Sequence, residues 1–194
     1  MRTLSLRRLA DVQMGYSFRT GVESNPSAQV GVIQMKDLGD DHIVDLGSLA
    51  RVTLDVRPDL RVREGDVIFR SRGDRPTCAI VADDPGCTVI AAPLLRLRVT
   101  DPRIMPAYLN WLINHPSAQA RLARHAEGTY VKMISKRSLE DLEIDVPTLE
   151  RQRRIVELSR LSARECILRD DRDALRERMV SVIMMSYAQG GAAQ

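Results

Sequence analysis

The residues best suited to chemistry lie in the stretch EGDVIFRSRGDRPTCAIV, residues 64–81. Arg70, Arg72 and Arg75 surround a glycine at its centre, and apolar runs typical of strands lie on both sides. Guanidinium groups bind phosphate and guanine through paired hydrogen bonds. The pattern therefore favours a strand that carries an anion-binding loop at its tip, although solvated hairpin arginines would give the same pattern.

The acidic residues Asp59, Glu64 and Asp66 are the nearest approach to a catalytic set. Nucleases often bind a divalent metal through such an acidic pair with a lysine nearby, but no lysine occurs between residues 37 and 131. Asp66 follows Gly65 in a turn, where its carboxylate is expected to accept a backbone hydrogen bond. The sequence contains no P-loop, no glycine-rich dinucleotide turn and no G-x-S-x-G motif. We expect no catalytic residue, no metal and no cofactor, with a small metal-dependent nuclease as an alternative.

Basic, polar and aromatic residues coincide at several expected strand and loop ends. Such side chains contact phosphates and base edges in complexes with DNA. We expect a surface that binds double-stranded DNA, formed by Tyr16, Arg19, Gln34, Lys36, Arg70, Arg72, Arg75, Thr129, Tyr130, Lys132, Ser135 and Lys136.

The composition agrees with such a partner but does not require it. All of the 29 basic residues except Lys36, Lys132 and Lys136 are arginine, and the net charge is +3. Codon usage in a GC-rich genome would produce the same arginine bias. The three cysteines have no C-x-x-C spacing, which argues against a disulfide framework or a cysteine zinc site. Neither a signal-peptide core nor a membrane-length apolar run is visible, so we expect a cytoplasmic protein without a membrane partner.

Turn signals and apolar periodicity predict the elements that position these residues. An α+β fold is expected, with a mixed recognition domain over residues 1–147, one long helix over 148–187 and a flexible tail over 188–194. Expected strands cover 29–38, 65–70, 77–83, 87–99 and 143–150, and expected helices cover 105–116 and 117–126, the second capped by Ser117. Residues 149–187 contain no glycine or proline, which predicts one long helix.

The long helix carries a heptad pattern. Its seam consists of Leu158, Leu161, Glu165, Leu168, Arg172, Leu175, Met179 and Val182. If two copies pack antiparallel about Leu168, Leu161 faces Leu175 and Glu165 faces Arg172. A parallel pair would place like charges together, so the pattern favours an antiparallel homodimer. Packing against the chain's own domain or against a different protein are the alternatives.

Several segments follow one another along the chain: LADVQMGYSFR, VIQMKDL, LRVREGDVIFRSRG, APLLRLRV followed by PAYLNWLINHP, and EGTYVKMISKRSLEDLEIDVPTLERQRRIVEL. In this order they resemble the specificity (S) subunits of type I restriction–modification systems. Arg151 departs from the last motif, where the family commonly has an acidic residue.

The resemblance implies a non-catalytic DNA target recognition domain followed by one conserved spacer helix. Family members usually carry two of each in one chain, with the helices antiparallel, so this chain resembles a half-subunit. A homodimer would then read a bipartite, symmetric DNA target and deliver methyltransferase (M) subunits, with or without a restriction/translocase (R) subunit. The alternative is a recognition module of another phage-defence or DNA-modification complex.

Overall fold

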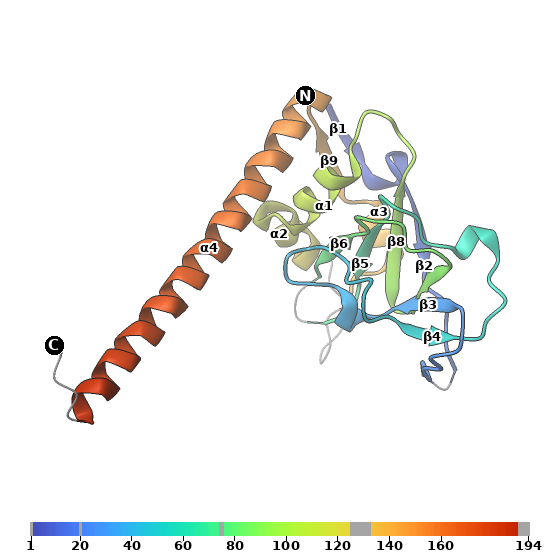
Figure 1. Cartoon of the computed structure of the whole chain (residues 1–194). Helices are drawn as coiled ribbons and strands as arrows, with labels where there is room; N and C mark the ends of the chain where they lie inside the picture. The colour runs from blue at the N-terminus through green and yellow to red at the C-terminus, as the bar shows by residue number, and fades with distance from the viewer. Residues whose placement is uncertain (1, 20, 74–75, 125–132, 190–194) are drawn as a thin grey trace. The chain divides into compact units, whose positions relative to one another are not determined.

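The structure, a computed structural model, describes residues 2–19, 21–73, 76–124 and 133–189. The chain divides into two units, Met1–Val156 and Glu157–Gln194. The first unit mixes strands and helices, and the second consists of most of one long helix, so the expected α+β class is confirmed (Figure 1). In the part of the chain that is described, no helix combines the length and hydropathy needed to cross a membrane.

The strands of the first unit form three sheets in the described residues, with strand orders β1-β9, β2-β8-β5-β6 and β4-β3-β7. The strands are β1 (Arg2–Ser5), β2 (Ala10–Met14), β3 (Val30–Ile33), β4 (Ala50–Val52), β5 (Val67–Arg70), β6 (Cys78–Ile80), β7 (Thr88–Ile90), β8 (Leu94–Val99) and β9 (Glu143–Val146). The helices are η1 (Leu6–Arg8), η2 (Met35–Asp37), η3 (Pro58–Leu60), α1 (Pro106–Asn114), α2 (Pro116–Arg124), α3 (Lys136–Glu140) and α4 (Leu149–Ala188).

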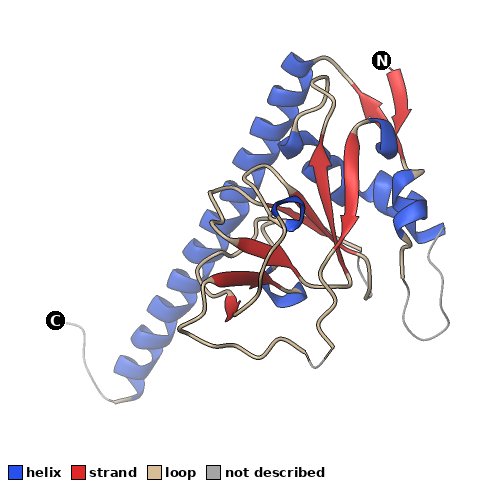
Figure 2. Cartoon of the chain, turned by 90° about the vertical axis from the view of Figure 1, so that its right-hand side faces the viewer, coloured by secondary structure: helices blue, strands red, loops and turns tan. Residues whose placement is uncertain are grey.

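The four-stranded sheet is buried on both faces, which explains the unbroken apolar run of β5. Val67 and Phe69 pack with α1 in one core cluster, whereas Ile68 points to the other face. There it packs with Ile33 and Ile90 of the three-stranded sheet. Figure 2 shows the strands in red, with the short strands of the three-stranded sheet near one end of the longer ones. That end carries the carboxyl termini of β2 and β5.

Several expected elements differ from the structure at their ends. The strand expected over 29–38 stops at Ile33, because η2 follows it, and the strand expected over 87–99 is two strands, β7 and β8. Between β7 and β8 the chain turns, and the Leu94 amide donates to the Ala91 carbonyl at 3.0 Å. The strand expected over 143–150 ends at Val146, because α4 already begins at Leu149.

Ser117 does not cap the second helix, because α2 begins one residue earlier, at Pro116. The Ser117 hydroxyl instead lies 2.9 Å from Nδ1 of His115. Three strands were not expected at all: β1, β2 and β4. In β2, Ala10 and Val12 are buried and Asp11 is exposed, which is the period-two alternation of a strand.

The first turns of α4 belong to the first unit. The side chain of Gln152 is fully buried and makes three hydrogen bonds, all to main-chain groups. Its Oε1 accepts from the Met105 amide at 2.8 Å, and its Nε2 donates to the carbonyls of Arg103 at 2.7 Å and Pro147 at 2.8 Å. Ile155, which the antiparallel register would pair with Val182, packs against the core of its own unit instead.

Candidate nucleic-acid interface

The β5 tip, Arg70–Gly73, follows three fully buried residues that hold the strand in place. Arg70 donates from Nη2 to the Met35 carbonyl at 2.7 Å, and its Nε has no hydrogen-bond partner among the described residues. The Ser71 side chain is buried and donates to the Pro93 carbonyl, whereas Arg72 is exposed. Gly73 has φ +123°, a conformation that other residues rarely adopt, and its Cα hydrogens face open space. The tip therefore presents Arg72 to solvent next to a backbone turn that glycine adopts without strain, whereas Arg70 is partly exposed.

Gly15 and Tyr16 lie against the β7–β8 turn, residues 91–93. The Gly15 amide donates to the Leu94 carbonyl at 2.9 Å, and the Tyr16 amide donates to the Ile90 carbonyl at 2.7 Å. The Ala92 amide returns a bond to the Tyr16 carbonyl at 2.9 Å. A Cβ on residue 15 would lie 2.7 Å from the Ile90 carbonyl oxygen, so only glycine fits.

Gln34 and Lys36 reach the same turn from β3. The Ala91 amide donates to the Ile33 carbonyl at 2.9 Å, so the chain leaves β3 beside the turn. The Gln34 amide then donates to the carboxylate of Asp37 at 2.7 Å, which closes η2 and leaves Lys36 exposed. Burial raises the pKa of Asp37, although the bond from the Gln34 amide opposes this shift.

The segment before α3 also returns to the β5 tip. Met133 lies directly opposite Arg72 in an antiparallel bridge, and the Ile134 amide donates to the Ser71 carbonyl at 2.8 Å. Ser135 caps α3, because its Oγ accepts from the Ser138 amide at 3.1 Å. This segment is therefore the fourth part of the chain that meets near the β5 tip. The Ser135 hydroxyl, however, is already engaged in capping α3.

The structure says less about the remaining residues that were predicted to bind DNA. The Lys136 ammonium lies 3.5 Å from the carboxylate of Glu140. Arg19 is exposed, but no described contact holds it against the β5 tip. The other members of the predicted set lie outside the described residues: Arg75, Thr129, Tyr130 and Lys132.

These contacts gather four distant parts of the chain around the β7–β8 turn. We define the candidate interface as the surface that carries the predicted residues brought together there: Tyr16, Gln34, Lys36, Arg70 and Arg72. The surface is basic, and it carries no acidic residue of the predicted catalytic set. Such a surface can neutralise phosphates and offers amide, guanidinium and phenol groups for base edges.

Asp66, one member of the acidic set, is already engaged in a buried ion pair. Asp66 is buried, and Arg98 donates a hydrogen bond to each of its carboxylate oxygens, from Nε at 2.8 Å and from Nη2 at 2.6 Å. Asp66 also accepts from the Arg63 amide at 2.8 Å, which confirms the turn hydrogen bond predicted from the sequence. Among the described residues, no cluster of three or more histidine, cysteine or acidic side chains could hold a metal ion.

Sequence reasoning missed the role of Arg96 and Arg98 in β8. Arg96 is buried and donates from Nη1 to the carbonyls of Asp59 at 2.8 Å and Arg61 at 3.2 Å. Burial lowers the pKa of Arg96, whereas the hydrogen bonds to Asp66 raise the pKa of Arg98. An arginine inside the apolar run LLRLRV was the available signal, because a buried guanidinium must find oxygen partners.

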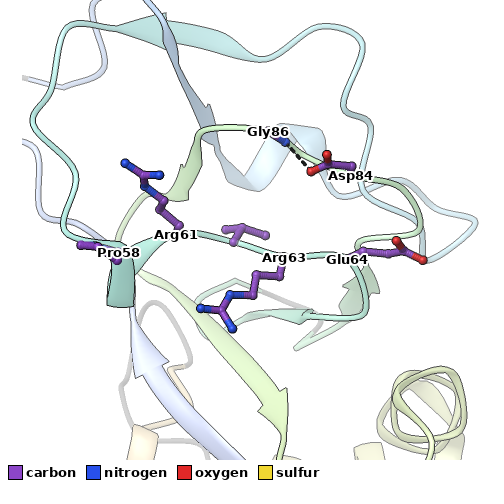
Figure 3. A pocket seen from close by; sticks show the side chains of 7 residues that line it. Pro58, Arg61, Arg63, Glu64, Asp84 and Gly86 are labelled. Atoms are coloured by element: carbon purple, nitrogen blue, oxygen red, sulfur yellow. Dashed lines mark hydrogen bonds between the residues drawn. The ribbon is translucent and has the colours of Figure 1, made fainter.

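The loop that these arginines hold borders a cavity of about 490 Å³ (Figure 3). Its lining includes Arg61, Arg63, Glu64 and Asp84. Figure 3 shows that Arg61 and Arg63 point to opposite sides of the chain, so their charges do not converge. Asp84 accepts from the Gly86 amide at 2.9 Å. This cavity therefore lacks the convergent donors of an anion site, and we assign it no function.

The apolar seam positions of α4 are all exposed in the single chain. They are Leu158, Leu161, Leu168, Leu175, Met179 and Val182. Glu165 pairs with Arg169 of the same helix at 2.6 Å, and Arg172 pairs with Asp173 at 2.8 Å. Exposed pairs of this kind contribute little and can exchange partners. The second unit thus offers a long apolar stripe with two opposite charges inside it.

The order of sheets followed by one long helix is similar to the fold of solved S subunits of type I restriction–modification systems. No protein-family model and no curated protein matches the chain. The HsdS subunit from Thermoanaerobacter tengcongensis aligns with a TM-score of 0.68 at 20% identity, over 98% of this chain and 45% of that one. The S subunit from M. genitalium aligns with a TM-score of 0.54 at 17% identity, over 96% of this chain and 42% of that one.

A third neighbour comes from a structural study of complex assembly and conformational transition in the type I R-M system. It aligns with a TM-score of 0.69 at 20% identity, over 94% of this chain and 43% of that one. The resemblance noted in the sequence is therefore confirmed at the level of the fold. The chain spans less than half the length of each of these neighbours.

Proposed function

We propose that this chain is a non-catalytic specificity subunit that recognises double-stranded DNA through the candidate interface. The observation that carries the proposal is the convergence of Tyr16, Gln34, Lys36, Arg70 and Arg72 on one edge of this fold. The role as a DNA reader for methyltransferase (M) subunits, with or without a restriction/translocase (R) subunit, follows by analogy with proteins of the same fold.

The proposal includes an antiparallel homodimer through α4. Supporting it, Leu161 would face Leu175, Leu158 would face Met179 and Glu165 would face Arg172, and all of these side chains are exposed in the single chain. Two-fold symmetry would then present two candidate interfaces to the DNA. The expected target is a bipartite sequence with two inverted half-sites.

Arg72 offers a direct test of DNA binding. Arg72→Gln should weaken binding to a duplex by removing one cationic contact, and the dependence of the binding constant on salt should become less steep by about one ion. Arg8→Gln is the matched control, because Arg8 is exposed and precedes β2 at the end opposite Gly15. Equal salt slopes for the two variants and the unaltered protein would exclude Arg72 from the interface.

The role in methylation is tested in the source cell with and without the gene, by long-read detection of modified bases. Loss of methylation at one palindromic bipartite motif is expected. Loss at an asymmetric motif would refute the homodimer, because it would mean pairing with a different half. An unchanged methylome would refute the methylation role and favour a recognition module of another DNA-modification or defence complex.

Cysteine cross-linking tests the direction of the helix pairing. In a Cys166→Ser background, Leu161→Cys and Leu175→Cys chains should form a disulfide when mixed, and neither should cross-link to itself. Self-linked Leu161→Cys dimers would instead indicate parallel helices, because residue 161 would then face residue 161. If the protein stays monomeric at every concentration tested, the proposed homodimer is refuted.

A further inference from the structure

Two exposed methionines flank the arginines of the β5 tip. The Met35 carbonyl accepts the hydrogen bond from Arg70, and Met133 lies opposite Arg72 in the antiparallel bridge. Their exposed fractions are 38% and 45%. Neither methionine belongs to a core cluster of the described structure. Arg70 is thus bonded to the main chain of one exposed methionine, and Arg72 lies opposite the other.

A single exposed apolar side chain is ordinary, but this pairing is specific. The methionines come from η2 and from the segment before α3, almost 100 residues apart in sequence, and main-chain contacts bring both to one short tip. The neighbouring Lys36 is exposed and adds positive charge. An apolar surface that is interleaved with cations suits a polyanion that also carries apolar groups.

In duplex DNA, the C5-methyl group of thymine is the apolar group that base pairs present in the major groove. The methionine side chain is unbranched and polarizable, so it can adapt to a methyl group at a wet surface. A cation beside it can take a phosphate or a guanine at the same time.

We propose that Met35 and Met133 read thymine methyl groups, so that each half-site contains at least one thymine whose methyl contributes to recognition. The inference rests on the proposed DNA-binding function and adds the chemistry of one base contact. Removing one buried methyl weakens an apolar contact by about fourfold in equilibrium constant.

The test uses two libraries of randomised duplexes, one made with thymine and one with uracil, which lacks only the methyl group. The unaltered protein should select one motif from the thymine library. Uracil at the contacted position of that motif should weaken binding by about fourfold for each methyl group lost.

Variants assign the effect to residues. Met35→Ala or Met133→Ala should bind the thymine duplex more weakly and should lose the difference between thymine and uracil at one position. Met184→Ala is the matched control, because Met184 is an exposed methionine of α4 outside the seam, and it should keep the full difference. Met35→Ala and Met133→Ala each change an exposed side chain, so both variants should fold. The comparison of thymine with uracil on the unaltered protein does not depend on the folding of either variant.

The outcomes separate this inference from the proposed function. Failure to select any motif from the thymine library would overturn sequence-specific DNA binding itself. Selection of a motif that binds equally well with uracil at every position would leave DNA recognition standing and overturn the methyl contact. A full thymine preference in both methionine variants would overturn the assignment to Met35 and Met133.

Discussion

Replacing Gln152 by alanine should destabilise the first unit strongly, because this one side chain satisfies three main-chain groups. The Met105 amide and the carbonyls of Arg103 and Pro147 all bond to it at 2.7–2.8 Å, and it is fully buried. Alanine would leave these groups without partners in a site closed to water. At about 1 kcal/mol for each, the loss is about 3 kcal/mol in the free energy of unfolding.

Urea denaturation followed by tryptophan fluorescence measures this loss. Trp111 is the only tryptophan of the chain and packs against the core of the first unit, so it reports unfolding of that unit. With a urea dependence of about 2 kcal/mol per M, the midpoint should fall by about 1.5 M. Arg153→Ala, on the exposed side of the same turn, is the control and should change the free energy by less than about 0.5 kcal/mol.

Gln152→Glu sharpens the test. The glutamate can still accept from the Met105 amide, but it would bring a carboxylate against the carbonyls of Arg103 and Pro147. It should therefore destabilise the unit at neutral pH at least as much as alanine does. If Gln152→Ala unfolds at the same urea concentration as Arg153→Ala, the hydrogen bonds of Gln152 do not hold the helix start, and the reasoning is refuted.

Three further outcomes are expected. Asp66→Asn should lower the free energy of unfolding by about 3 kcal/mol in urea titration, because it breaks the ion pair with Arg98 at a buried carboxylate; a neutral effect would contradict this role. Burial raises the pKa of Cys78, so under native conditions thiol reagents should label the exposed cysteine of α4 and leave Cys78 unmodified in mass spectra. Hydrogen bonds from Arg103 lower the pKa of Asp101 to about 2, so NMR titration should show this value and Arg103→Gln should raise it. Because the folded pKa lies below the ordinary 3.8, the stabilisation from Asp101 is complete above that pH and is lost as the pH falls toward 2.

The sequence predicted elements that are long or bounded by strong turn signals. The helix over 149–187 was predicted almost to its last residue, because a run without glycine or proline leaves little alternative. The strand at 65–70 was found because Gly65 and Gly73 delimit its apolar run. The strands β1 and β4 were missed, because three or four residues of mixed polarity give no periodicity to count.

The sequence offered a set of candidate binding residues, but it could not say which of them meet. Their partners are main-chain groups such as the carbonyls of Met35 and Ile90, which leave no mark in the sequence. The same holds for Arg96, whose partners are carbonyls of a loop more than 30 residues away. Only the three-dimensional path of the chain reveals which loops share an edge.

Main-chain hydrogen bonds hold the segments of the candidate interface together, and this determines which of its residues can change during evolution. Gly15, Tyr16, Ile33 and Ile134 hold their segments to the β7–β8 turn and the β5 tip through amides and carbonyls. Those bonds do not depend on which side chain a residue carries. Exposed interface residues such as Lys36 and Arg72 can therefore be exchanged with little loss of folding stability, whereas Gly15 cannot. The candidate interface could thus acquire a different set of exposed side chains in single steps on an unchanged scaffold.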